Sequence, residues 1–168
     1  MILMKTLDHK TLLHIIQYDP ETGDFFWKSP RPKIQVRTKA GSLHYRGYIN
    51  VCIDGKSYMG HRLAWFYMIG EWPSNQIDHI NRNKSDNKFA NLREATNGQN
   101  RANTKTTNKH GLKGVRLLPW MKKTGKCWQA QITHNNKVHY LGCYRTKEEA
   151  HFRYCKAATE FHKDFSNF

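Results

Sequence analysis

The sequence lacks every feature that would place the chain in or on a membrane. It has no apolar run long enough to cross a bilayer, no lipidation motif and no basic helix with a bulky apolar face. Its first ten residues, MILMKTLDHK, lack the basic head and apolar stretch of a secretory signal. We therefore expect no membrane partner and a cytoplasmic location.

Cysteine is scarce and scattered along the chain. The four residues are Cys52, Cys127, Cys143 and Cys155, and no two of them form a C-x-x-C pair. This spacing predicts neither a structural zinc site nor a disulfide framework. We interpret the four cysteines as small core residues.

Acidic residues are also few. There are 28 Lys and Arg residues against 13 Asp and Glu, which gives a formal net charge of +15. Such a surplus predicts a polyanionic partner. Two thirds of it lies beyond residue 100, so we expect the C-terminal third to be the stronger anchor.

The first hundred residues mix short strands with helices. A helix is predicted over 10–18, and residues 47–59 alternate like a hairpin around Asp54-Gly55, a dipeptide suited to a type I′ turn. Residues 61–70 have helical apolar spacing and end at Gly70. Three aromatic residues of this region are assigned to the core: Trp65, Phe66 and Trp72.

Three strand candidates follow a polar linker, at residues 113–118, 127–133 and 137–144. A final helix is indicated by the possible capping box of Thr146 with Glu149 and by helical apolar spacing after it. This pattern predicts a three-stranded antiparallel sheet with one packed helix. Strand alternation directs Trp128, Ala130 and Ile132 to the helix and Gln129, Gln131 and Thr133 outward.

The candidate catalytic residues lie in the segment IDHINRNKSDN, residues 77–87. Neighbours on a strand point to opposite faces, so Asp78 and His79 cannot easily act on one another. They suit a single phosphate, however. Phosphodiester hydrolysis needs a hard cation, for which Asp supplies oxygen, and a base that is neutral near pH 7, which His supplies.

The longer segment DHINRNKSDNKFANLREATNGQNRAN resembles the HNH nuclease family, specifically the phage and intron-encoded homing endonucleases. The resemblance covers about residues 18–104 and implies a ββα-metal fold, in which a hairpin and a helix grip one cation. It implies that Asp78 and Asn100 are metal ligands and that His79 is the general base. Asn91 would tie the loop to the catalytic strand and orient His79. The oxygen-only ligand pair suits Mg²⁺ or Mn²⁺.

Several neighbouring residues have two interpretations. Arg62, Arg82 and Lys84 either contact phosphate or keep the surface soluble. Asn103 is the replacement ligand if the register of the helix is shifted by one turn. His61 is more typical of a core-edge or capping residue than of a ligand.

Residues 110–168 resemble the Apetala/ethylene-response-factor type of DNA-binding domain, through KGVR, WQAQI, YLGCY and the following EEA helix. In that family the sheet lies in the DNA major groove. The resemblance and the strand alternation give these candidate contacts: Arg116, Gln129, Gln131, Thr133, Val138 and Tyr140. Lysines in the turns would add attraction to phosphates: Lys122, Lys123, Lys126 and Lys137.

The sequence therefore predicts an α+β protein with a nuclease domain over 1–104, a linker over 105–111 and a DNA-binding domain over 112–168. The expected function is metal-dependent cleavage of double-stranded DNA at a recognised site, in a bacterial or phage-infected host cell. One active centre makes one nick, so a monomer is favoured, and double-strand cleavage would need a dimer or two visits. The alternative is a DNA-binding regulator with a vestigial nuclease. RNA binding is disfavoured because no aromatic platform is evident.

Overall fold

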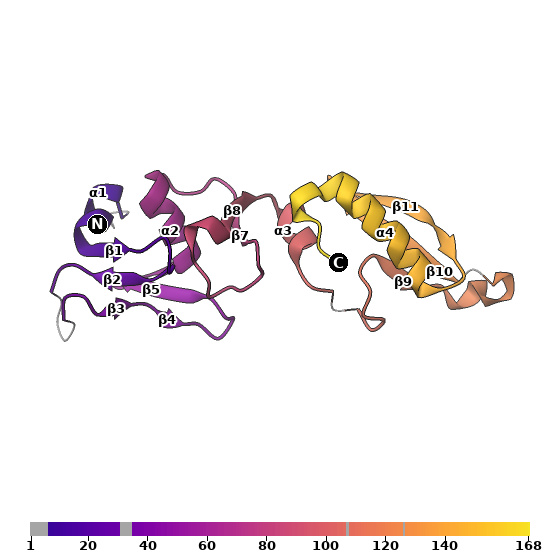
Figure 1. The fold of residues 1–168 in the computed structure, drawn as a ribbon, viewed down its shortest axis with the longest axis horizontal. Coiled ribbons are helices and arrows are strands. Elements are labelled where there is room, and N and C mark those ends of the chain that lie inside the picture. Colours follow the sequence, from indigo (N-terminus) through magenta and orange to yellow (C-terminus); the bar gives the residue numbers. More distant parts are fainter. Residues whose placement is uncertain (1–6, 31–34, 107, 126) are drawn as a thin grey trace, which may run out of the picture. The chain divides into compact units, whose positions relative to one another are not determined.

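The chain divides into two compact units, Met1–Glu94 and Ala95–Phe168 (Figure 1). The computed structural model describes residues 7–30, 35–106, 108–125 and 127–168. Both units mix small sheets with helices. Within the described ranges, no helix has the length and apolar character needed to cross a membrane.

In its described residues, the first unit contains two α-helices, one short 3₁₀ helix and three small sheets. Its helices and strands are α1 (His9–Ile15), β1 (Ile16–Tyr18), β2 (Phe25–Trp27), β3 (Lys39–Ala40), β4 (Ser42–Leu43), β5 (Ile49–Ile53), β6 (Lys56–Met59), α2 (Gly60–Ile69), β7 (Gln76–His79), the short 3₁₀ helix η1 (Phe89–Asn91) and β8 (Leu92–Ala95). The sheets have the orders β1-β2-β3, β4-β5-β6 and β7-β8. One core joins them, because Leu12, Phe25, Val51, Leu63 and Ile77 belong to a single buried cluster.

The first predicted helix ends earlier than its apolar spacing indicated. Helix α1 stops at Ile15, and Ile16–Tyr18 forms β1, which pairs antiparallel with β2. Ile16 lies opposite Trp27, and both are buried. Pairing with the next strand thus overrides the local helical period, and a β-branched residue is well suited to that pairing.

The predicted turns of this unit are confirmed. Asp54 and Gly55 have φ values of 50° and 77°, as a type I′ turn between β5 and β6 requires. Gly70 ends α2 in the left-handed conformation at φ 86°, which glycine adopts without a steric penalty.

Two assignments to the core need correction. Phe66 is buried and Trp65 is partly buried against the core, but Trp72 is 36% exposed, although its ring stacks on Phe66. None of the four cysteines is buried, and Cys52 is exposed. It lies on β5 between buried Val51 and Ile53, so strand alternation turns it outward.

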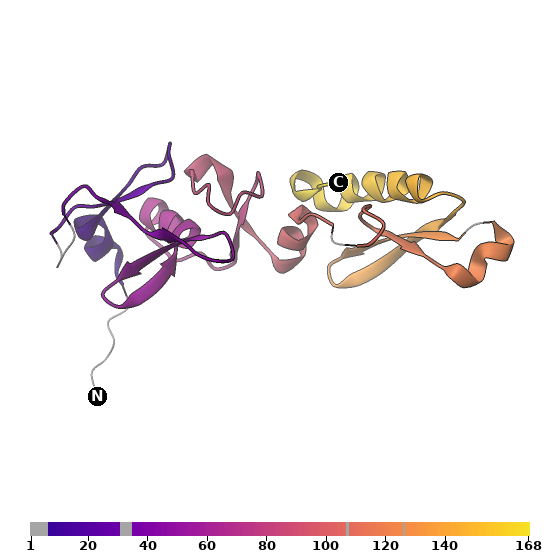
Figure 2. The ribbon, with the colours of Figure 1, turned by 90° about the horizontal axis from the view of Figure 1, so that it is seen from below.

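The second unit is a sheet covered by a helix. Its elements are α3 (Asn97–Asn103), β9 (Val115–Leu117), η2 (Pro119–Thr124), β10 (Trp128–His134), β11 (Lys137–Tyr144), α4 (Lys147–His162) and η3 (Lys163–Phe165). The antiparallel strand order is β11-β10-β9, and α4 runs along one face (Figure 2). The predicted inward side of β10 is confirmed, since Ala130 and Ile132 are buried in clusters with residues of α4.

The division between the units comes before α3, whereas the predicted first domain extends to residue 104. Helix α3 is held by the second unit, because Asn167 Nδ2 donates to Asn103 Oδ1 at 3.1 Å. The ammonium group of Lys113 also donates to the carbonyls of Ala102 and Thr104. Part of the predicted linker is ordered as a turn, with the Gly111 N–H bonded to the Asn108 carbonyl at 3.1 Å.

Candidate active site

Strand β7 places two polar side chains in the interior of the first unit. Ile77, Asp78 and His79 are consecutive and all buried, and Asp78 and His79 are each 5% exposed. A strand with buried residues on both faces must satisfy its polar groups inside the fold. The partners of Asp78 and His79 therefore define what each side chain can do.

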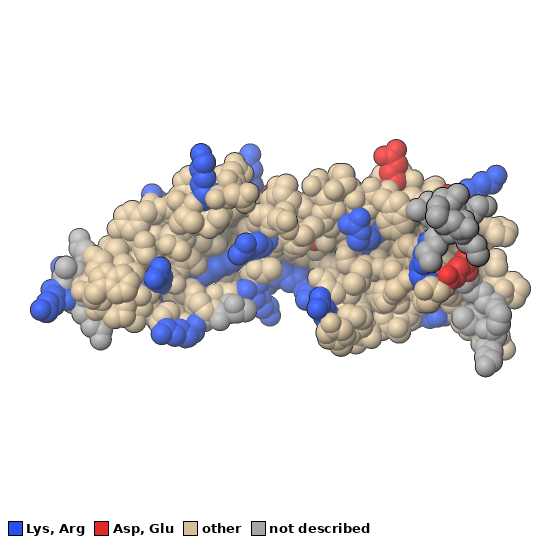
Figure 3. Space-filling view, turned by 180° about the vertical axis from the view of Figure 1, so that it is seen from behind, with Lys and Arg blue, Asp and Glu red and all other residues tan. Residues whose placement is uncertain are grey.

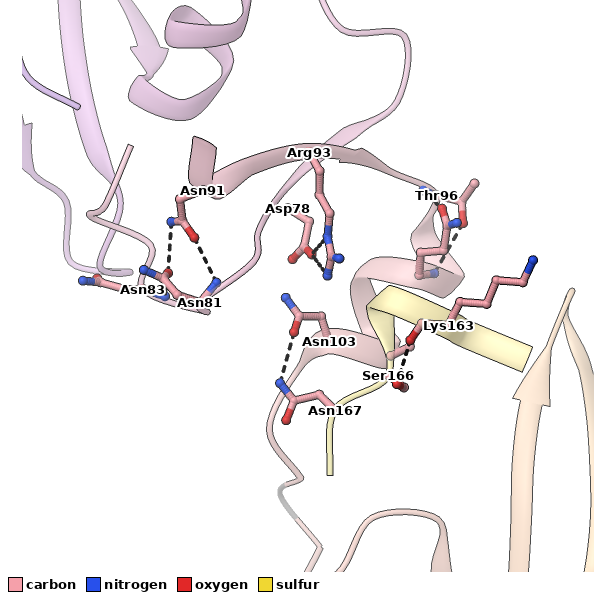
Figure 4. A network of polar contacts seen from close by, with 12 residues as sticks. Asp78, Asn81, Asn83, Asn91, Arg93, Thr96, Asn103, Lys163, Ser166 and Asn167 are labelled. Carbon is pink, nitrogen blue, oxygen red and sulfur yellow. Dashed lines mark hydrogen bonds and ion pairs between the residues drawn. The ribbon is translucent and has the colours of Figure 1, made fainter. Parts of the chain in front are cut away.

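Asp78 forms an ion pair with Arg93 of β8 (Figure 4). Nε and a terminal nitrogen of Arg93 both lie 2.9 Å from Asp78 Oδ2. The side chain of Asp78 is 6% exposed and that of Arg93 is 17% exposed, so little water screens the pair. The pair joins β7 to β8 and holds the carboxylate in one orientation.

His79 contacts a different set of residues. Its Nε2 lies 3.2 Å from Asn87 Oδ1, and its ring is close to those of His61 and Tyr48. Burial lowers the pKa of His79, and Lys84 adds to the shift, while the bond to Asn87 and the charge of Asp78 act in the opposite direction. The net shift is downward, so the imidazole is neutral near pH 7, as a general base must be.

His61 is a second buried histidine beside His79, with 5.1 Å between the ring centroids. It is 7% exposed and is the second residue of α2, which agrees with its prediction as a core-edge residue. Burial, followed by the proximity of His79 and Arg62, lowers the pKa of His61 to about 3. Both imidazoles are therefore uncharged in the folded protein at neutral pH.

His61 should make the stability of the protein depend on pH. Its pKa is lower in the folded than in the unfolded state, so between pH 6.5 and about 3 the unfolded chain binds the extra proton and stability falls as pH falls. We expect His61 to contribute up to about 1.4 kcal/mol per pH unit in that window. Urea denaturation from pH 7.5 to 4.5 should give a steeper loss for the wild type than for His61→Leu. Parallel curves would contradict this prediction.

Asn91 connects the loop after β7 to the start of β8 (Figure 4). Its Oδ1 accepts from the Asn81 N–H at 3.0 Å, and its Nδ2 donates to Asn81 Oδ1 at 3.0 Å and to the Asp86 carbonyl at 2.8 Å. The Ile80 N–H also donates to the Asn91 carbonyl at 2.9 Å. One amide side chain thus fixes both ends of the loop, immediately after His79.

The three basic residues with open interpretations occupy different environments. Arg62 donates to the carbonyls of Pro73 and Asn75, so it holds the segment before β7 in place. Lys84 is exposed, lies 4.8 Å from the Tyr48 ring centroid and donates to the Arg46 carbonyl. Arg82 is exposed at φ 64° in the turn after His79. Arg82 and Lys84 stay candidates for phosphate contact.

The predicted metal ligands lie in different units, Asp78 in the first and Asn100 on α3 in the second. Both donors are oxygens, which fits a hard divalent cation. Both Arg93 bonds use Asp78 Oδ2. Asn103 fits the role less well, because it is 4% exposed and its Oδ1 accepts from Asn167. Among the described residues, no group of three or more His, Cys, Asp or Glu side chains could hold a metal ion.

The candidate DNA contacts of the second unit share the outer face of its sheet. Strand register pairs Gln129 with Arg116, Gln131 with Tyr140, and Thr133 with Val138. Directly paired residues point to the same face. Val138 and Tyr140 are each 63% exposed, and Arg116 and Thr133 are exposed as well.

The lysines predicted to contact phosphate are only partly described. Lys137 is exposed at the start of β11, and Lys123 is exposed within the 3₁₀ helix η2 rather than in a turn as predicted. Lys126 and the side chain of Lys122 lie outside the described residues. On the face drawn in Figure 3, Lys and Arg side chains are distributed over both units, and Asp and Glu are visible at few places.

One family model matches the segment that contains Asp78 and His79. Residues 58–102 match the family model described as HNH endonuclease. The HNH segment, as we call residues 58–102, includes Asp78, His79, Asn91 and Asn100. It starts in β6 and ends in α3. It is the part of the chain that is similar to HNH endonucleases.

Two further comparisons used solved structures and curated proteins. The structure reported as "DNA binding and cleavage by the HNH homing endonuclease I-HmuI" aligns with a TM-score of 0.43 and 18% identity, over 95% of this chain and 92% of that chain. The comparison with curated proteins found no match.

The sequence did not indicate the two residues that contact Asp78 and His79 in the structure, which are Arg93 and Asn87. Arg93 stands two positions after Asn91, and strand alternation would have placed the two on one face without indicating Asp78 as a partner. Asn87 was treated only as part of a polar loop, although it is 1% exposed and bonds His79. A buried amide within a polar loop has no periodic signal in the sequence.

Proposed function

We propose that the protein is a metal-dependent DNA endonuclease of the HNH homing type, with His79 as its general base. The observation that carries this proposal is the environment of His79 within the HNH segment. The imidazole is buried, held by an amide oxygen and kept neutral at physiological pH, next to a buried carboxylate. A neutral, oriented imidazole beside a cation ligand is what hydrolysis of a phosphodiester requires.

In this mechanism His79 removes a proton from a water molecule as the water attacks phosphorus. Asp78 and Asn100 would hold one divalent cation, Mg²⁺ or Mn²⁺, which when bound stabilises the negative charge on the phosphate and the leaving 3′-oxygen. Arg93 fixes the carboxylate of Asp78. Asn91 fixes the loop that follows His79, and the exposed Arg82 and Lys84 lie in that loop, where they would contact the DNA backbone.

We further propose that the second unit binds double-stranded DNA through the outer face of its sheet, in the manner of the Apetala/ethylene-response-factor type domain. Support comes from the register that gathers Arg116, Gln131 and Tyr140 on one face, and from the charge surplus beyond residue 100. Amide and guanidinium groups are the usual readers of base edges in the major groove. A second binding unit on the same chain raises the effective concentration of DNA at the nuclease.

The decisive experiment is a nicking assay on supercoiled plasmid. Purified full-length protein should convert plasmid to the open circular form with Mg²⁺ or Mn²⁺, and EDTA should abolish the conversion. Absence of nicking with both metals, while DNA binding persists in a gel-shift assay, would instead identify a DNA-binding regulator with a vestigial nuclease. Counting open circles against linear products measures whether one protein nicks or cuts both strands.

Salt dependence should reveal which basic residues contact phosphate. For B-DNA, each phosphate contact contributes about 0.9 to the slope of log K against log salt concentration. We expect Lys137→Ala and Arg82→Ala each to reduce the slope by about 1. Lys28→Ala is the matched control, because its ammonium group donates to the Leu13 carbonyl within the first unit. An equal change for Lys28→Ala would show that only overall charge matters.

A further inference from the structure

The side chain of Asn87 makes a polar contact with the ring of His79, between Asn87 Oδ1 and His79 Nε2. We propose that Asn87 is a positioning residue that holds His79 in the tautomer with its proton on Nε2, so that Nδ1 serves as the base. This inference rests on the proposed role of His79 as the general base. It adds a residue that neither the family match nor the sequence pattern assigns a role.

With the amide oxygen of Asn87 facing His79, as in the structure, this contact selects one tautomer. A neutral imidazole has one N–H donor and one acceptor nitrogen, while an amide oxygen only accepts. His79 Nε2 lies 3.2 Å from Asn87 Oδ1, so the bond requires the proton on Nε2 and leaves the lone pair on Nδ1. His79 and Asn87 are 5% and 1% exposed, and in such a dry environment a hydrogen bond selects between tautomers more strongly than in water.

Asn87 is well fixed for this purpose. Its carbonyl accepts a bond of 2.6 Å from the hydroxyl of Tyr18, far away in the sequence. Gly23 and Gly60 both lie against Asn87. A Cβ at Gly23 would be 2.6 Å from the Asn87 carbonyl carbon, and a Cβ at Gly60 would be 2.8 Å from Asn87 Nδ2. The backbone and the amide are therefore enclosed by two residues that lack side chains.

The other end of the amide makes the proposal testable. Asn87 Nδ2 is buried and has no hydrogen-bond partner among the described residues. A buried donor without a partner is costly, so each such group in a folded protein calls for an explanation, of which a catalytic role is one. Rotating the amide by 180° would present Nδ2 to His79 and force the proton onto Nδ1. The two orientations thus predict opposite tautomers, which can be measured.

The test uses ¹⁵N NMR of the histidine side chains in the full-length, metal-free protein at pH 7.5. The His79 signals, assigned with His79→Gln, should show a protonated Nε2 and an unprotonated Nδ1. Asn87→Asp keeps an acceptor oxygen at the same place and should retain this pattern. Asn87→Leu removes the acceptor and should give a mixture of tautomers. A protonated Nδ1 in the wild type, or an unchanged tautomer in Asn87→Leu, would overturn the proposal.

Nicking kinetics supply the functional readout. We expect Asn87→Leu to lower kcat by roughly 10–100-fold with KM for DNA unchanged, in line with other residues that orient a histidine through one hydrogen bond. Asn87→Asp should recover most of kcat. Gly60→Ala, which pushes on the amide without touching His79, should lower kcat in the same direction and gives a second test if Asn87→Leu does not fold.

Tyr18→Phe is the structural control, because it removes the bond to the Asn87 carbonyl and leaves the amide in place. It should reduce stability while the tautomer and kcat stay unchanged. An equal loss of kcat in Tyr18→Phe and Asn87→Leu would assign Asn87 a purely structural role. If the wild type does not nick DNA, the NMR result still decides the tautomer, so failure of the nuclease proposal is distinguished from failure of this one.

Discussion

Replacing His79 with alanine is expected to lower the rate of metal-dependent nicking by about 10²–10⁴-fold, the usual contribution of a general base. The variant loses the only group that we assign to removing the proton from the attacking water. Affinity for DNA should change little, because the imidazole is 5% exposed and presents little surface to a ligand. Single-turnover nicking and gel-shift titration on the same preparations separate the two quantities.

His14→Ala is the matched control for this experiment. His14 is an exposed histidine in the last turn of α1, and its replacement should leave nicking unchanged. The thermal midpoints of both variants need to be measured, because alanine at position 79 leaves space in the core of the first unit. A folded His79→Ala protein that nicks plasmid at the wild-type rate would refute the assignment of the base.

Much of the architecture could be predicted because it depends on local rules. The Asp54-Gly55 turn follows from two residues that tolerate positive φ, and the inward side of β10 follows from strand alternation. The segment Ile16–Tyr18 could not be predicted in this way. Its helical spacing is outweighed by pairing with β2, a contact made across the turn at residues 19–24.

The site shows the same limit. The motif supplied Asp78, His79 and Asn91, and the structure shows that Asn91 bonds the loop that follows His79. It did not supply the partners of the buried groups, Arg93 and Asn87, because these are chosen by the packing of β7 against its neighbours. Buried polar groups must find hydrogen bonds, but the sequence alone does not say where.

The ion pair of Asp78 with Arg93 provides the second large prediction. Removing one member of a buried pair leaves the other charge in the interior, which costs about 3–5 kcal/mol. We expect Asp78→Asn and Arg93→Met each to lower the free energy of unfolding by about that amount, measured by urea denaturation. The double variant should be more stable than the sum of the single changes predicts, since neither charge is then left without its partner.

Nicking activity should not follow the free energy of unfolding in this series of variants. This difference separates the role of Asp78 in the ion pair from its proposed role as a metal ligand. Arg93→Met keeps the carboxylate, so at a temperature where it is folded it should nick DNA faster than Asp78→Asn, with the deficit reduced by higher Mg²⁺ concentration. The double variant regains stability but still lacks the carboxylate, so its nicking should stay as low as that of Asp78→Asn. If nicking returned together with stability in the double variant, Asp78 would act only through its ion pair, and its assignment as a metal ligand would have to be abandoned.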